Sequence, residues 1–194
     1  MQFKVGEKAV YPAHGVGVIK AIESSRIEGI DTTYYVLKIL DNGMTIMVPV
    51  QNAAAIGMRQ IMDVSYIERI MEILQDRETP TDNQTWNRRY REYMTKIKTG
   101  DPLEVAKVLR DLAIMKMEKN LSFGERKMYD QARTLLVQEM ACARNLEEAQ
   151  VAREIDGLFV PPEGAKPAAD PLAEKPARKG RGGDDDEDES EFDE

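Results

Sequence analysis

Thr-Thr-Tyr-Tyr-Val-Leu-Lys-Ile-Leu (residues 32–40), Asp-Asn-Gly (41–43) and Met-Thr-Ile-Met-Val-Pro-Val (44–50) form the stretch that decides the fold. The β-branched and aromatic residues of the first segment favour a strand. Asn42-Gly43 is a strong hairpin signal, because both central positions of the turn tolerate positive φ. Pro49 lacks an amide donor, so the returning strand is predicted to lie at a sheet edge or to end there.

The β pattern extends upstream of this hairpin. Val16, Val18 and Ile22 alternate with other residues, as in a half-buried strand, and Glu28-Gly29-Ile30-Asp31 predicts a turn. Four or five short strands in so short a segment predict a small SH3-like or Tudor-like β-barrel, which we place at residues 1–60.

After residue 60 the apolar residues repeat at helical spacing. Asp63 predicts the start of a helix to Leu74, and residues 77–85 read as a linker. The next helix, Trp86 to Lys98, carries its apolar stripe on Trp86, Tyr90, Tyr93, Met94 and Ile97.

Local start and stop signals define the remaining helices. Gly100 ends the Trp86 helix, Asp101 and Pro102 start the next, and Ser122 to Glu125 form a capping box for a fourth. A last short helix is predicted over Leu146 to Ile155. Together these signals predict a compact all-α domain over 61–160 and an α+β fold for the chain.

Charge is distributed unevenly along the chain. The net charge is −8, and residues 161–194 alone carry 5 basic and 12 acidic side chains. This segment has no periodicity, so we expect a disordered acidic tail. Residues 86–133 hold 12 basic and 7 acidic side chains, a balance of +5. A basic block in an acidic chain indicates a polyanionic partner.

Several classes of function are disfavoured by what the sequence lacks. His14 and Cys142 are its single histidine and single cysteine, so neither a His/Cys metal site nor an intrachain disulfide is expected. No Walker or dinucleotide-binding loop is present, and we expect no cofactor and no enzymatic activity. The absence of a signal peptide or apolar span predicts a cytoplasmic protein without membrane contact.

Basic side chains gather on one helix face and at one helix start. Arg88, Arg91 and Lys98 fall within an arc of about 80° at the helical repeat, opposite the apolar stripe. They form either a phosphate track or a solvated face. Arg126 and Lys127 lie in the first turn of the capped helix, where their charge opposes the helix dipole unless a polyanion binds there.

Trp86 is the single tryptophan and stands immediately before this basic segment. Its helical phase is compatible with packing in the core. The alternative is a partly exposed wedge that unstacks a base step in a DNA minor groove while basic neighbours hold the backbone.

Three segments resemble the CarD/CdnL family of bacterial RNA-polymerase-binding transcription regulators. They are Phe3 to Gly17, Trp86 to Arg91, and Leu121 to Met128, in the family's order and spacing, and the resemblance covers roughly residues 1–158. It implies a Tudor-like N-terminal domain that binds the polymerase β subunit. It also implies a helical domain that contacts promoter DNA without sequence preference at the upstream edge of the melted region.

The resemblance also implies roles for individual residues. Trp86 occupies the position of the family's minor-groove wedge, which stabilises the open promoter complex. The other implied DNA contacts are Arg88, Arg89, Arg91, Arg126 and Lys127, and the implied polymerase contacts are Arg26, Thr45, Met47 and Pro49. An adaptor that joins proteins in transcription without touching DNA remains an alternative, as does a tail that competes with DNA for the basic residues.

Overall fold

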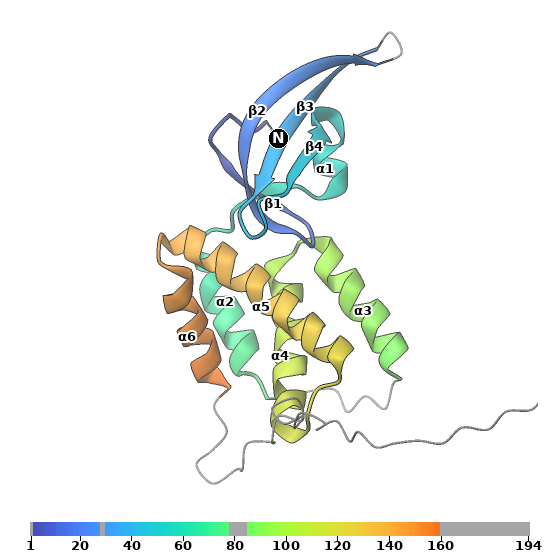
Figure 1. The fold of residues 1–194 in the computed structure, drawn as a ribbon. Coiled ribbons are helices and arrows are strands. Elements are labelled where there is room, and N and C mark those ends of the chain that lie inside the picture. The colour runs from blue at the N-terminus through green and yellow to red at the C-terminus, as the bar shows by residue number, and fades with distance from the viewer. Residues whose placement is uncertain (1, 28–29, 78–84, 160–194) are drawn as a thin grey trace, which may run out of the picture.

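The computed structural model describes residues 2–27, 30–77 and 85–159. In this part of the chain a five-stranded antiparallel sheet is followed by a block of α-helices (Figure 1). The α+β fold class predicted above is confirmed at this level. The predicted acidic tail, 161–194, and most of the predicted 77–85 linker lie outside the described residues.

The strands are β1 (Lys8–Tyr11), β2 (Gly15–Ile27), β3 (Ile30–Ile39), β4 (Thr45–Pro49) and β5 (Arg59–Gln60), in the spatial order β4-β3-β2-β1-β5. The order places β4 at an edge, which confirms the prediction made from Pro49. The Asn42-Gly43 hairpin is also confirmed: Gly43 has φ of 69° and the Met44 N–H donates to Asn42 Oδ1 at 2.9 Å.

Two predictions for the β region need correction. Ile30 and Asp31 already belong to β3, so the predicted 28–31 turn is too long, and residues 28–29 lie outside the described part. Val50 belongs to a 3₁₀ turn, η1 (Val50–Asn52), rather than to β4, because the chain turns after Pro49 into the one-turn helix α1 (Ala53–Ile56).

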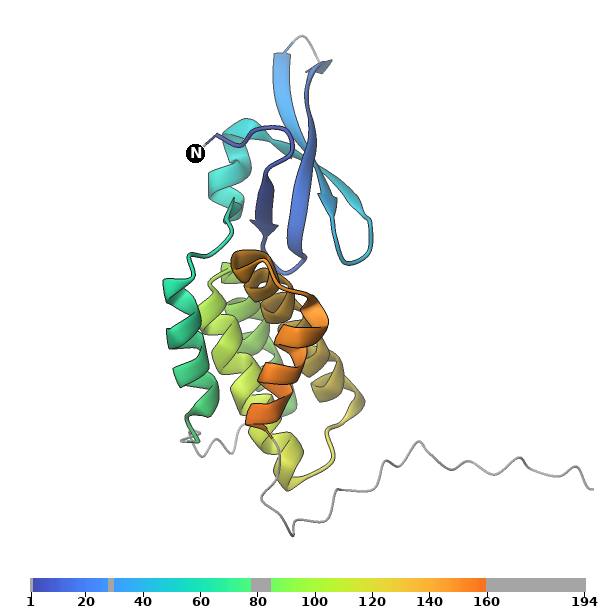
Figure 2. The same ribbon diagram turned by 90° about the vertical axis from the view of Figure 1, so that its left-hand side faces the viewer.

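The helical half consists of α2 (Ser65–Gln75), α3 (Trp86–Thr99), α4 (Pro102–Glu118), α5 (Phe123–Arg144) and α6 (Glu148–Leu158). Figure 2 shows the sheet above these helices, with α6 packed beside α5. None of the described helices is long and apolar enough to cross a membrane.

The predicted helix starts are largely confirmed. The Asp101 carboxylate accepts the Leu103 N–H at 2.9 Å, and Ser122 and Glu125 form the complete capping box. Asp63 accepts the Ser65 N–H at 2.9 Å, although α2 itself begins at Ser65. The last helix begins two residues later and extends three residues further than predicted.

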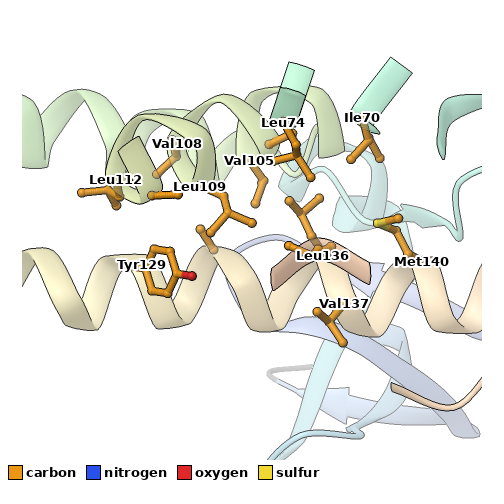
Figure 3. Close-up of a cluster of buried hydrophobic side chains, with 14 of the residues drawn as sticks. Ile70, Leu74, Val105, Val108, Leu109, Leu112, Tyr129, Leu136, Val137 and Met140 are labelled. Atoms are coloured by element: carbon orange, nitrogen blue, oxygen red, sulfur yellow. The ribbon is translucent and has the colours of Figure 1, made fainter. Parts of the chain in front are cut away.

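Apolar side chains of α2, α3, α4, α5 and α6 form the helical core, part of which is drawn in Figure 3. Leu109 and Leu112 of α4 and Leu136 and Met140 of α5 all belong to this core and are fully buried. A separate core beneath the sheet contains Tyr35, whose hydroxyl accepts the Phe3 N–H at 3.1 Å.

A partly buried ion pair joins the two halves. Arg59 of β5 donates from Nε and Nη2 to the Gly100 carbonyl, at 2.8 and 2.6 Å, and its guanidinium also pairs with Glu139 of α5. Glu139 is only 4% exposed and additionally accepts the Met62 N–H at 2.9 Å. One carboxylate thus connects α5, β5 and the segment that leads into α2, so the sheet has a defined place on the helices.

Candidate nucleic-acid interface

Trp86, the first residue of α3, packs on the first turn of α5. A Cβ added at Gly124 would lie 3.0 Å from Cζ2 of the indole, so a larger residue at this position would push the ring from its place. The Tyr90 ring stands edge-on to the indole with a centroid separation of 5.6 Å. The indole is half-buried at the margin of the helical core and retains an open side.

Arg89 was expected to face DNA, but its side chain points into the protein. Its side chain is only 14% exposed, and Nη2 donates to Glu125 Oε1 at 2.9 Å. Its guanidinium carbon lies 5.9 Å from the centroid of the Trp86 ring. Arg89 therefore lies beneath the surface, because the buried Glu125 carboxylate needs a cationic partner.

Glu125 is a fixed negative charge inside this basic region. Burial raises the pKa of its carboxyl group, but the hydrogen bonds from Ser122 and the positive charges of Lys119 and Arg89 outweigh that effect. The net pKa is lowered, so the group is ionised at neutral pH. Since Glu125 binds Arg89 of α3 and caps α5, it holds the two helix starts together and supports the indole.

The remaining predicted cations lie nearer the surface. Arg88, Arg91 and Lys98 are all exposed, as the helical phase predicted, and Arg88 makes only a long contact of 3.6 Å with Glu92. Lys127 is exposed and Arg126 is half-buried in the first turn of α5. The first turns of α3 and α5 lie at the same end of the helical half (Figure 1). They bring Arg88 and Arg91 together with Arg126 and Lys127, whereas Lys98 lies at the other end of α3.

Tyr90 is a residue that sequence reasoning misplaced. Its phase predicted the inner stripe, yet 43% of it is exposed, because at the first turns of α3 its ring meets the indole rather than the core. Tyr90 lines a groove of about 570 Å³ together with Gly124 and Lys127, and the groove continues to Ala13 and His14 in the β1–β2 loop.

Phe123 was not singled out at all. It is the first residue of α5 and is 85% exposed. The capping box could have pointed to it. Ser122 and Glu125 already satisfy the hydrogen bonds of this helix start, so capping gives no reason for an apolar residue between them.

Three of the four implied polymerase contacts lie on one sheet edge. Thr45, Met47 and Pro49 alternate along β4 and share its outward face, with Met47 half exposed. Arg26 lies on β2 and is paired with Asp31 of β3. On β3, Asp31 is three residues from Tyr34, which is the partner of Pro49. The set is therefore a strand edge with one more distant cation.

The potential metal ligands of the described part of the chain do not gather in one place. No group of three His, Cys, Asp or Glu side chains there is close enough to hold a metal ion. His14 is exposed, and Cys142 is half-buried, with its sulfur 3.6 Å from Lys8 Nζ.

Comparison with known proteins gives a consistent result. Residues 3–62 match the family model of the CarD-like/TRCF RID domain, and residues 69–156 match that of the CarD C-terminal domain. A protein of Bacillus subtilis (strain 168), named "Putative transcription factor YdeB", is 37% identical over 153 residues, which cover 77% of this chain and 97% of that protein.

A solved structure, CdnLNt from Myxococcus xanthus, is 45% identical over 32% of this chain and 87% of its own, with a TM-score of 0.28. The two domain models match consecutive parts of the chain in order, and the Bacillus relative spans both. The chain therefore belongs to the CarD family of transcription regulators.

Proposed function

We propose that this chain is a non-enzymatic, cofactor-independent transcription regulator that works in the cytoplasm, at the nucleoid. Its Tudor-like unit, residues 1–60, binds the RNA polymerase β subunit. Its helical unit, residues 61–160, contacts promoter DNA without sequence preference and stabilises the open complex through Trp86. The observation that carries the proposal is a partly exposed indole, packed against Gly124 and Arg89, next to the exposed cations of α3 and α5.

The basic residues differ in burial, and we assign them different roles for that reason. Arg88, Arg91 and Lys127 are exposed and suited to phosphate contacts, whereas the Arg89 guanidinium is occupied by Glu125. We therefore assign Arg89 the role of positioning Trp86, and the phosphate contacts to the other cations, with Arg126 at their margin.

The polymerase contact is supported by the geometry of β4. This edge strand pairs only with β3 within the described sheet and carries Thr45 and Met47 on an exposed face. Such an edge can accept a strand from a partner. Docking by this edge raises the local concentration of the helical unit at the promoter, so weak DNA affinity is sufficient.

Stabilisation of the open complex is limited by differential binding. A wedge together with backbone contacts favours DNA that is already unstacked over paired duplex. The open complex gains stability equal to this difference in affinity and no more.

Replacing Trp86 with alanine should shorten the lifetime of the open complex about fivefold or more, because a lost aromatic–base contact costs about 1–3 kcal/mol. Binding to a polymerase β fragment should be unchanged. The measurement is the decay of competitor-resistant promoter complexes, with a pull-down as the control. Parallel loss of β-subunit binding and of thermal stability would show that Trp86 acts only in packing.

Removal of exposed cations should change the salt dependence of DNA binding. Neutralising about four phosphates predicts a slope of log K against log salt concentration of about −3.6, and each lost contact should reduce the slope by about 0.9. Arg88→Gln with Arg91→Gln should therefore give about −1.8, whereas Arg69→Gln on α2 should leave it unchanged. A wild-type slope near zero contradicts the DNA role and favours a protein adaptor.

A further inference from the structure

Phe123 is the most exposed large apolar side chain in the described part of the chain. It is 85% exposed, and the next highest of this group, Val5, is 59% exposed. The helix start does not require an aromatic side chain there, because Ser122 and Glu125 complete the capping box. Leu121, on the other side of Ser122, is the residue that is buried. Exposure of Phe123 is therefore not a consequence of capping or of core packing.

The helical repeat places Phe123 among the cations of α5. At about 100° per residue, Arg126 lies about 60° to one side of Phe123 and Lys127 about 40° to the other. The first turn of α5 thus presents an apolar ring between two basic positions. This arrangement fits DNA, whose charged backbone flanks apolar base and sugar surfaces.

The backbone of Phe123 adjoins the residue that faces Trp86. A Cβ added at Gly124 would lie 3.0 Å from the indole, and the Cα atoms of Phe123 and Gly124 are about 3.8 Å apart. Tyr90 extends the same aromatic surface on the α3 side. Aromatic rings that share a surface with cations are the usual platform for unstacked bases.

We propose that Phe123 is a second apolar DNA contact, which packs against the base step that Trp86 opens. The inference rests on the proposed function and adds to it a residue from α5. The aromatic contact with DNA is then built from two helices whose starts are joined by the Arg89–Glu125 pair. The ligand is DNA with an unpaired or unstacked base at the edge of a melted region.

Photo-crosslinking in the complete complex tests this directly. The full chain with p-benzoylphenylalanine at position 123, at 86 or at 64 is assembled with polymerase and promoter DNA. Val64 is the exposed apolar control on the loop before α2. We expect positions 86 and 123 to crosslink to neighbouring nucleotides at the edge of the melted region, and position 64 to give no DNA adduct.

The outcomes separate the two proposals. DNA adducts at 86 without adducts at 123, or adducts at 123 to polymerase alone, overturn the role of Phe123 and leave the proposed function intact. No DNA adduct at either position counts against both. As a second measurement, Phe123→Ala should shorten the lifetime of the open complex about fivefold or more with unchanged thermal stability. Phe123→Tyr should retain most of the open-complex lifetime, because it keeps the aromatic ring. An unchanged lifetime in Phe123→Ala rejects the inference.

Discussion

Replacement of Glu139 with alanine is expected to lower the free energy of unfolding by about 3 kcal/mol, the low end for a buried pair, because it leaves the Arg59 guanidinium, which is 25% exposed, without its carboxylate. The Arg59 guanidinium would keep only the Gly100 carbonyl and the neighbouring Gln60 carbonyl, and the Met62 N–H would lose its acceptor. Since small domains are stable by about 5–15 kcal/mol, this is a large fraction of the total. Urea denaturation followed by circular dichroism measures it.

The control for this variant removes both charges, because losing one partner of an ion pair costs more stability than replacing both with apolar residues. Arg59→Met combined with Glu139→Met removes both charges, so it should destabilise the protein less than Glu139→Ala alone. Glu139→Gln should fall between these variants, because the amide oxygen can still accept the Met62 N–H. A double variant that is less stable than Glu139→Ala would show that the side chains contribute through packing rather than through charge.

The joint also determines how the two proposed binding surfaces are related in space. Arg59 and Glu139 connect the sheet, which carries β4, to α5, whose other end supports Trp86. Loosening this joint should leave β-subunit binding intact while the unfolding transition broadens or separates into two steps. Open-complex stabilisation should fall as well, since docking would no longer direct the indole to one place.

Local signals made much of the fold predictable. Asn42-Gly43, Asp101-Pro102 and the Ser122–Glu125 box act through hydrogen bonds within three residues, so the sequence alone identifies them. The Arg59–Glu139 pair could not be predicted in this way. Its partners are 80 residues apart and meet only because the sheet packs on α5.

The candidate site shows the same division between local and tertiary effects. Helical phase correctly placed Arg88 and Arg91 on an exposed face. The same phase cannot reveal that Glu125, 36 residues away, draws Arg89 inward, or that α3 begins where the core ends and leaves Tyr90 exposed. Periodicity identifies the sides of a helix, but tertiary packing determines how much of each side is covered.

Replacement of Glu125 with alanine should have a comparable effect at the other end of α5. It breaks the capping box, which costs about 1 kcal/mol, and leaves Arg89 without its carboxylate, which costs about 3–5 kcal/mol in the interior. The exposed carboxylate of Glu92, replaced with glutamine, is the matched control and should change stability by no more than about 0.5 kcal/mol.

The pH dependence of this effect has a defined sign. The pKa of Glu125 is lower in the folded protein than its ordinary value of 4.5, so the folded state favours the ionised carboxylate. Its contribution is therefore complete above about pH 4.5 and is lost as the pH falls through the lower folded value. The stability difference between wild type and Glu125→Gln should shrink over that acidic interval, and a difference that grows there would contradict the assignment.

Trp86 reports the local consequence, because it is the single tryptophan. Without Glu125, Arg89 no longer has an anchor beneath the indole, and the turn that carries Gly124 loses its cap. We expect the emission of Trp86 to shift to longer wavelength and its quenching by iodide to rise at denaturant concentrations where the protein is still folded. If open-complex stabilisation depends on a wedge held in place, it should fall in Glu125→Ala even though no DNA-facing side chain has been changed. If Trp86 fluorescence shows a mobile indole but open-complex stabilisation is unchanged, the DNA itself must order Trp86 on binding.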